Sequence, residues 1–264
     1  MRAGVISVLT VNYQSGEDLR GLIESLRSHA TGTDVEVIVT NNSPSEALDF
    51  AREERSFPVS IVDSPNVGFG AGINRAFRES RGEIIFIANP DVRINDETFP
   101  QARAYLEEHS DVGILLPLLR YPEGDVQLSI RRFYTWPVVM YARSPLRGIG
   151  PPPEFFRRYL YEGASRTQPR DVDWGLGAAM FLRRMDVVEA GEIFDERFFL
   201  YFEDVDLCYR MWRRGKRVVY CPRIECIHDH RRSSARPISK AGWRHFQSLL
   251  KFVAKHRGLP GRPR

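Results

Sequence analysis

A cluster of carboxylates directly follows an aromatic run near residue 200. The segment Phe198–Leu207 reads FFLYFEDVDL and holds Glu203, Asp204 and Asp206. Acidic residues in the first turn of a helix often serve only as partners of the helix dipole. Like charges packed near apolar rings also raise the pKa of a carboxylate and suit it to general-base catalysis. The segment therefore indicates either a plain helix start or a catalytic base.

A second carboxylate follows an apolar run that ends in a turn. The stretch EIIFIANPDVRI places Asp91 directly after Asn89 and Pro90, although a turn needs only those first two residues. His228 closes a later apolar run, and a single histidine at such a position is more often a core or surface residue than a ligand. An Asp and a neutral His that converge on one crevice would suit Mn²⁺ or Mg²⁺, completed by phosphate oxygens.

Alternating strands and helices must position these groups. Apolar, β-branched runs predict strands at Val5–Val11, Val35–Val39, Val59–Val62, Glu83–Ala88 and Val112–Leu116. Helical patterns lie between these strands. The first is an apolar stripe from Leu19 to Leu26, which follows a capping-box signature at Ser15. A short helix to about Arg55 and helices at Phe69–Ser80 and Asp96–Glu108 follow, and Asn95 is predicted to cap the last of them. This rhythm predicts an α/β fold with a mostly parallel, Rossmann-like sheet flanked by helices.

Polar residues follow each of the first four strands. They are Asn12-Tyr13, Asn41-Asn42-Ser43, Asn66-Val67-Gly68 and Asn89-Pro90-Asp91. Parallel sheets bind ligands beyond the carboxyl ends of their strands, so these residues predict a polar ligand crevice. The glycines at 68, 70 and 72 match neither the dinucleotide fingerprint, which would need glycine at Ile73, nor a P-loop. They allow close helix–sheet packing or close approach of a ligand.

The second half of the chain has a different texture. Residues 120–171 form a long connection rich in Pro, Arg and aromatic residues, which is typical of a lid or binding loop. A helix is predicted at Glu203–Arg214, with Gly215 as its stop, and short strands at Lys216–Tyr220 and Ile224–Ile227. The tail, residues 231–264, is basic and carries Trp243, Phe246, Leu249, Leu250 and Val253 at helical spacing. That helix either lies on a membrane surface or packs on its own core.

Composition limits the classes of function. The 264 residues are 42% hydrophobic, with a formal charge of +4 and a pI near 9.0. This balance fits an Arg-rich solvated surface as well as phosphate, anionic lipid or nucleic acid. No apolar run approaches the ~20 residues of a membrane span, and Met1 leads straight into a strand without a signal-peptide pattern. Three cysteines without pairing motifs agree with a predicted cytoplasmic location.

The ordered motifs resemble those of family 2 inverting glycosyltransferases of the GT-A fold, particularly the rhamnosyltransferase-like branch. They are VNY at 11–13, VIVTNNS at 37–43, NVGF at 66–69, NPD at 89–91, VDWGLGAA at 172–179 and FDERFFLYFEDVDL at 194–207, followed by His228. The likeness extends over about residues 4–256. It implies a GT-A domain at 1–230, with a nucleotide-binding half at 1–118 and an acceptor half at 119–230, before the basic tail.

The resemblance implies transfer of a sugar, rhamnose being one candidate, from a dTDP- or UDP-sugar to a saccharide or polyprenyl-linked acceptor in cell-surface polysaccharide synthesis. Mg²⁺ or Mn²⁺ would be held by Asp91 and His228, and Asp204 would be the base, supported by Glu203. The donor pocket would be lined by Val11, Asn12, Tyr13, Asn41, Asn66, Gly68, Phe69, Asn74 and Asn89. Trp174, Gly177 and Asp206 would shape the sugar and acceptor sites.

Two departures from the family pattern affect these roles. Asn89 replaces the first carboxylate of the D-x-D pattern, which leaves fewer negatively charged side chains to bind the metal. Asn41 stands where many relatives have an Asp that contacts the base. Because an amide both donates and accepts hydrogen bonds, the nucleobase preference stays open.

Two other functions compete with this hypothesis. A sugar-nucleotide nucleotidyltransferase would share the α/β architecture but needs a Gly-rich, basic loop after the first strand, where the sequence is NYQS. A non-enzymatic nucleic-acid-binding protein would explain the pI but gives Asp204 no role. We expect no nucleic-acid partner. A peripheral association with the inner face of the membrane and the oligomeric state are left open by the sequence.

Overall fold

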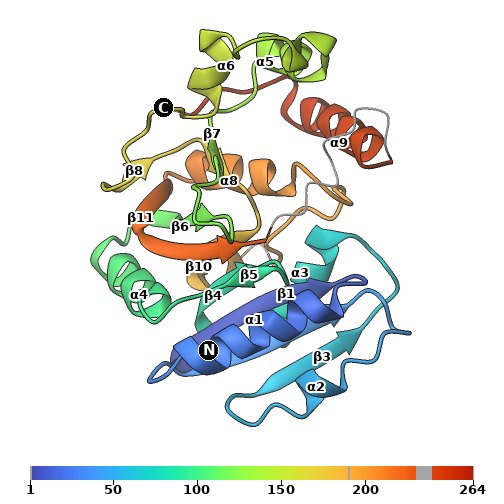
Figure 1. Cartoon of the computed structure of the whole chain (residues 1–264), viewed down its shortest axis with the longest axis vertical. Helices are drawn as coiled ribbons and strands as arrows, with labels where there is room; N and C mark the ends of the chain where they lie inside the picture. The colour runs from blue at the N-terminus through green and yellow to red at the C-terminus, as the bar shows by residue number, and fades with distance from the viewer. Residues whose placement is uncertain (1, 190, 230–239, 264) are drawn as a thin grey trace.

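A nine-stranded, mostly parallel sheet runs through the computed structural model (Figure 1). The structure describes residues 2–189, 191–229 and 240–263, so the first part of the predicted tail, 231–239, lies outside it. The strands are β1 (Arg2–Asn12), β2 (Val35–Asn41), β3 (Val59–Asp63), β4 (Gly82–Ala88), β5 (Val92–Arg93), β6 (Val112–Arg120), β8 (Arg170–Asp171), β10 (Ala179–Arg183) and β11 (Arg217–His228). Their order is β3-β2-β1-β4-β10-β6-β11-β5, with β8 paired to β11.

The predicted fold class is confirmed, with two differences in the strands. β10 is antiparallel to both β4 and β6, and β5 is antiparallel to β11; neither short strand was predicted. The two strands predicted between residues 216 and 227 are one strand, β11, whose pairing with β6 shifts register between Cys221 and Glu225. One sheet therefore spans both predicted halves, and their division at residue 118 stays a prediction.

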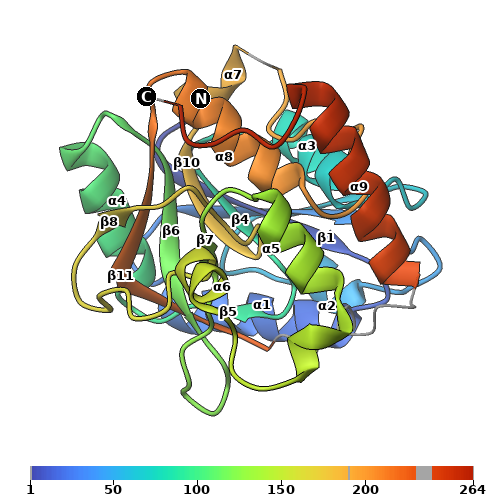
Figure 2. The same ribbon diagram turned by 90° about the horizontal axis from the view of Figure 1, so that it is seen from above.

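Helices cover both faces of this sheet (Figures 1 and 2). They are α1 (Gly16–His29), α2 (Asp49–Arg52), α3 (Phe69–Glu79), α4 (Thr98–Glu108), α5 (Trp136–Arg143), α6 (Glu154–Tyr159), α7 (Met185–Val188), α8 (Glu203–Arg213) and α9 (Lys240–His256), with a 3₁₀ turn η1 (Pro145–Gly148). The apolar stripes of α1 and α4 pack on one face. Those of α3 and α8 pack on the other face, and α9 joins the same core through Leu249 and Phe252.

The predicted helix starts need correction, whereas one predicted helix end is confirmed. Ser15 makes no side-chain cap to α1; its hydroxyl donates to Oδ1 of Asn12 instead. Asn95 does not cap α4 directly, because the helix begins later, at Thr98. Gly215 adopts a φ of 73° after α8, the left-handed conformation that ends helices.

The long connection at 120–171 is structured rather than a simple loop. It contains β7 (Ile130–Arg131), α5, η1 and α6, and β7 pairs with β9 (Trp174–Gly175) in a separate two-stranded sheet. Val138 and Val139 of α5 and Phe156 of α6 are buried in the core that also contains α8. The connection therefore forms a layer of its own beside the catalytic helix candidate α8.

Candidate active site

Asp91 and His228 come together at the edge of the sheet. Asp91 lies in the turn between β4 and β5, and β5 pairs with the end of β11, where Val92 lies opposite His228. The backbone N–H of Asp229 also donates to the carbonyl of Asp91, at 3.0 Å. Nε2 of His228 consequently lies 3.4 Å from Oδ1 of Asp91. The sequence predicted this convergence, and the antiparallel β5–β11 contact produces it.

Gln127 fixes the orientation of the His228 ring, a role that no sequence pattern indicated. Its amide Nε2 donates to the carbonyl of His228 at 2.6 Å, and its Oε1 lies 2.9 Å from Nδ1. An amide oxygen can only accept, so Nδ1 of His228 carries the proton and donates. In the neutral ring Nε2 then carries the lone pair and faces Asp91, the orientation of a metal-ligating histidine supported by a second polar residue.

Asp204 approaches the same edge across the loop at 176–178. The N–H of Gly177 donates to Oδ2 of Asp204 at 3.1 Å. One residue further, the carbonyl of Ala178 accepts the N–H of Asn89 at 2.8 Å. Two hydrogen bonds on one short loop therefore connect the Asn89–Asp91 turn to Asp204. The predicted metal residues and the predicted base lie on opposite sides of this loop.

Glu203 and Asp204 have different surroundings although they are neighbours at the start of α8. Glu203 is buried, with its Cβ facing Gly70 of α3, whereas Asp204 remains partly exposed. Burial and then the charge of Asp204 raise the pKa of Glu203 well above its ordinary value. Burial raises the pKa of Asp204 to about 6, although backbone hydrogen bonds and the charge of Arg131 oppose the shift. These shifts favour the neutral form of Glu203 and leave Asp204 as the carboxylate able to accept a proton near pH 7.

A strained turn presents these two carboxyl groups. Tyr201 and Phe202 both have φ of 69°, a left-handed conformation that costs non-glycine residues about 1–2 kcal/mol each. The Phe202 ring is buried and packs 5.0 Å from the ring of Tyr134 and 5.4 Å from that of Phe252. This aromatic packing holds the turn against its strain and fixes the start of α8.

Gly68 lies at the sheet edge that is predicted to bind the donor, and its backbone packs against residue 199, just before this turn. It has a φ of 93°, and the N–H of Phe69 donates to the carbonyl of Phe199 at 3.0 Å. A Cβ at position 68 would lie 2.2 Å from that same carbonyl oxygen. The approach of the two backbones, rather than ordinary helix packing, therefore requires glycine here.

Replacing Gly68 with alanine is expected to lower the free energy of unfolding by at least ~2 kcal/mol, because backbone strain and a collision add together. Gly124 provides the matched control, since it has a φ of 94° but open space around its Cβ position. Urea denaturation of Gly68→Ala and Gly124→Ala measures the difference. Equal losses in the two variants would contradict a specific role for the contact with Phe199.

Several residues predicted to line the donor pocket are internal. Asn12 is fully buried, donating to Asn41 and Glu46 and accepting from Ser15. Val11 is also buried, and its methyl groups face Gly72 of α3. Both side chains are buried and make their contacts inside the protein, which corrects the prediction that they face the donor pocket. Asn89 is partly exposed, whereas Tyr13 and Asn66 are exposed. The side-chain oxygen of Asn66 accepts the N–H of Gly68.

Asn74 is a second correction. Its amide donates to the carbonyl of Phe194 and to Glu196, and its oxygen accepts the N–H groups of Ile193 and Phe194. All of its hydrogen-bonding capacity is therefore used inside the protein. Asn74 is fully buried and ties α3 to residues 193–196 rather than contacting a nucleotide.

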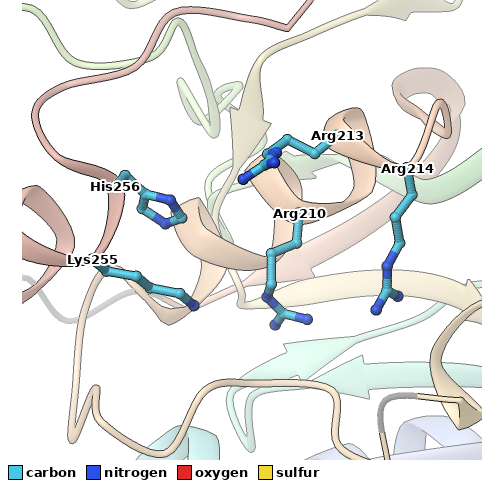
Figure 3. A pocket seen from close by; sticks show the side chains of 5 residues that line it. All are labelled: Arg210, Arg213, Arg214, Lys255 and His256. Carbon is cyan, nitrogen blue, oxygen red and sulfur yellow. The ribbon is translucent and has the colours of Figure 1, made fainter.

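Asp206 is a third correction. It lies two positions after Asp204, roughly 200° around the helix, and so faces away from the site. It is fully buried and binds Arg210, Lys255 and His256. Burial alone would raise its pKa, but these three cationic or donor groups lower it. Basic side chains of α8 and α9 line an adjoining pocket of about 380 Å³. Figure 3 shows these side chains, and three of them, Arg210, Lys255 and His256, are the partners of Asp206.

The acceptor side is aromatic and cationic. Trp174 is buried, donates its indole N–H to the carbonyl of Arg132, and stacks on Tyr134 at 5.7 Å. Gly177 has no side chain to cover Asp204, and the Phe69 ring lies near its Cβ position. The charge of Arg131 lowers the pKa of Asp204. Sequence reasoning missed Arg131 and Tyr134, because nothing in the 120–171 pattern indicated which residues turn inward.

Comparison with known proteins identifies the chain. The model of "Glycosyl transferase family 2" matches residues 7–186, which include the Asn89–Asp91 turn and Trp174. The chain belongs to glycosyl transferase family 2. Its sheet and helices match the GT-A fold of solved glycosyltransferases.

Two curated relatives extend over nearly the whole glycosyltransferase. N-acetylglucosaminyl-diphospho-decaprenol L-rhamnosyltransferase of Mycobacterium tuberculosis is 29% identical, over 96% of this chain and 86% of the relative. Rhamnosyltransferase WbbL of Escherichia coli is 25% identical, over 98% of this chain and 96% of the relative. The predicted likeness to rhamnosyltransferases is thereby confirmed.

A solved structure supports the fold. GalNAc-T7, crystallised with UDP, GalNAc and Mn²⁺, superposes with a TM-score of 0.70 at 12% identity, covering 95% of this glycosyltransferase. The chain spans about half (48%) of the length of that structure. At this identity the likeness shows the fold alone.

Proposed function

We propose that this glycosyltransferase moves a sugar, with rhamnose as the first candidate, from a nucleoside-diphospho-sugar to a hydroxyl of a lipid-linked saccharide, with inversion at the anomeric carbon. The observation that carries the proposal is the loop at 176–178, which holds Asp204 on one side and the Asn89–Asp91 turn on the other. The rhamnosyltransferase relatives support the sugar, and the decaprenol named in one of them supports a polyprenyl-type acceptor.

Asp204 acts as the base in this proposal. A hydroxyl is a poor nucleophile near pH 7, and its proton must leave as the new bond forms. A carboxylate with a pKa of about 6 is ionised at that pH and still basic enough to take the proton. Glu203, held neutral, keeps a second negative charge away from Asp204, and the N–H groups of Gly177 and Val205 orient the carboxylate.

The residues present fit a divalent cation. The 3.4 Å pair of one carboxylate oxygen and one imidazole nitrogen is a donor set for Mn²⁺ or Mg²⁺. Within residues 2–189, 191–229 and 240–263 no third His, Cys, Asp or Glu joins them, so diphosphate oxygens and water would complete the coordination. Asp91 and His228 would hold the ion, and Asn89 would contact the donor or a metal-bound water. When bound, the cation stabilises the charge that develops on the diphosphate leaving group.

Nucleobase selection is assigned to Asp63 in this proposal. The oxygen of Asn41 already accepts hydrogen bonds from Asn12 and Ser43, and its amide donates to Oδ1 of Asp63 at 2.9 Å. Asn41 is buried, whereas the Asp63 side chain is half exposed at the same strand end. Oδ2 of Asp63 lies 3.5 Å from Arg52, but both side chains are half exposed, so Asp63 remains the acceptor for the N3–H of uracil or thymine, and Asn41 orients it.

Asp63→Asn is expected to weaken UDP binding about tenfold, because a hydrogen bond to a charged acceptor is lost. CDP has no N3–H, so its affinity should change less and the preference for UDP over CDP should fall. Competition binding of the two nucleotides measures this ratio. Asp49→Asn, an exposed acid of α2, is the control, and an unchanged ratio in Asp63→Asn would reject the assignment.

A donor screen tests the proposed function directly. UDP-, dTDP- and GDP-sugars are compared for thermal stabilisation of the protein and for transfer to polyprenyl-diphospho-saccharide acceptors, with and without Mn²⁺, and the anomeric configuration of the product is read by NMR. Saturable, cation-dependent donor binding with an inverted product supports the proposal. Release of diphosphate from a nucleoside triphosphate would instead indicate the nucleotidyltransferase, and salt-dependent retention of RNA or DNA without donor binding would indicate the nucleic-acid-binding protein.

A further inference from the structure

Large apolar side chains are exposed together on three consecutive short elements, α5, η1 and α6. Trp136 and Met140 of α5 are 56% and 68% exposed, and Leu146 and Ile149, within and just after η1, are 59% and 69% exposed. Phe155 of α6 adds a fifth exposed side chain, at 42%. These five residues are called the α5–α6 apolar face below. Isolated exposed apolar residues are ordinary, but a contiguous group marks an interaction surface.

The outward side of α5 is apolar although its inward side already fills the core. Val138 and Val139 are buried, whereas Trp136 and Met140 lie one helical turn apart on the opposite side. A helix that is apolar on both sides is normally covered on both sides. The described residues of this chain cover only one of them.

The charge of this segment favours an anionic partner. Residues 131–158 contain six arginines and a single acid, Glu154. Arg132, Arg143, Arg147 and Arg157 are exposed, and within the described ranges none of these four lies within ion-pair distance of a carboxylate. Two copies of the face would bring arginine against arginine, which opposes self-association. Exposed Trp and Leu side chains among unpaired arginines are the pattern of a surface that lies in the headgroup region of an anionic bilayer.

The start of α9 continues the face. Arg143 of α5 lies 4.8 Å above the Phe246 ring of α9, and Phe246 packs against Trp243, which is 61% exposed. Figures 1 and 2 both place α5 beside α9. Of the remaining apolar stripe of α9, Leu249 and Phe252 are buried in the core, whereas Leu250 is 52% exposed. The tail helix thus packs partly on its own core, and the largest group of exposed apolar side chains in the described chain, five of twelve, lies between the start of α5 and α6.

This face also adjoins the candidate active site. Tyr134, two residues before Trp136, stacks on Phe202, which directly precedes Glu203 and Asp204. In the described part of the chain no helix is long and apolar enough to cross a bilayer. We propose that the α5–α6 apolar face, with the first turn of α9, docks the protein on an anionic lipid surface and so brings the Asp204 side of the site toward the membrane. Docking on a lipid surface goes beyond the proposed function, since it does not depend on which sugar is transferred.

Flotation of the full-length protein with vesicles tests the proposal without any substrate. The protein is expected to bind vesicles of phosphatidylcholine mixed with phosphatidylglycerol and not vesicles of phosphatidylcholine alone. Trp136→Ser/Met140→Ser should weaken binding about tenfold or more, and Arg147→Glu/Arg157→Glu should do so most at low salt. Met185→Ser/Val188→Ser on α7 is the matched control, because these side chains are equally exposed (66% and 53%) and α7 lies away from α5 and α6 (Figure 2).

The results separate the proposal from its alternatives. Circular dichroism confirms that each variant is folded. No binding to the anionic vesicles, or equal loss in the α5 and α7 variants, overturns the proposal. A concentration-dependent dimer that Trp136→Ser/Met140→Ser dissociates would overturn it in favour of a second copy of the chain. Transfer of sugar to a short, water-soluble acceptor without vesicle binding would reject the membrane face and leave the proposed function intact.

Discussion

Asp204→Asn is expected to lower kcat about 10²–10⁴-fold, the contribution typical of a positioned general base. Asparagine keeps the shape of the side chain and one oxygen for the N–H groups of Gly177 and Val205, but it cannot accept the proton of the acceptor hydroxyl. Donor binding should change little, because Asp204 lies across the loop from Asp91. Steady-state transfer and nucleotide titration measure the two effects separately.

The neighbouring acid is the control for this result. Burial and the charge of Asp204 keep Glu203 protonated, and Gln resembles a protonated Glu. Glu203→Gln should therefore lose far less activity than Asp204→Asn. The base assignment fails if folded Asp204→Asn retains normal turnover, or if Glu203→Gln loses more activity than Asp204→Asn.

The pH dependence follows from the raised pKa of Asp204. A base works only when deprotonated, so kcat should rise with pH through about 6 and level off above it. Asp204→Asn should lack this limb. The free energy of unfolding should change with pH in the opposite direction. The folded state holds the proton of Asp204 more tightly than the unfolded chain does, so ionisation of Asp204 lowers stability as pH rises from about 4 toward 6. The melting temperature of Asp204→Asn at pH 7 is thus not expected to fall.

Asp91→Ala is expected to remove the cation dependence of nucleotide binding. With one of two protein ligands lost, Mn²⁺ affinity should fall more than the ~10–100-fold that follows the loss of a supporting residue. Gln127→Ala should show that smaller effect, because the His228 ring loses the partner of its Nδ1. Calorimetric titration of UDP at increasing Mn²⁺ concentration gives both values without relying on catalysis.

A second Asp–His pair supplies the control for this experiment. Asp96 and His29 lie 2.8 Å apart, closer than Asp91 and His228, but their side chains are more exposed, at 75% and 40% against 20% and 2%. Asp96→Ala should leave Mn²⁺-dependent UDP binding unchanged. Unchanged cation dependence in Asp91→Ala would reject the metal role.

Local patterns in the sequence were sufficient for the sheet and for the two main carboxylates. The five strands predicted in the first half, β1, β2, β3, β4 and β6, are mainly apolar and β-branched, and the polar residues after the first four reach one edge because parallel strands end there. Asp91 follows a strand and Asp204 begins a helix, so both positions are set by their immediate neighbours. The order of the motifs also supported the family, which the comparison confirmed.

Local patterns were insufficient wherever burial decided the role of a side chain. Asn12 and Asn74 are polar residues at the expected edge, yet internal hydrogen bonds occupy them completely. Asp206 was predicted to shape the acceptor site, but the helix turns its side chain into a charged cluster with α9. Gln127 and Arg131 lie in a stretch without regular periodicity, so nothing local distinguished them from their neighbours.

The sequence by itself determined the family, the parallel sheet, and the positions of Asp91 and Asp204 at a strand end and a helix start. Periodicity shows which residues share a face, because it depends only on neighbours in the chain. It does not show what covers that face. Only the tertiary structure placed His228 against Asp91 through the β5–β11 contact, buried the stripe of α9 and left the apolar face of α5 and α6 exposed. These features depend on contacts between distant segments, which set burial and hydrogen-bond partners.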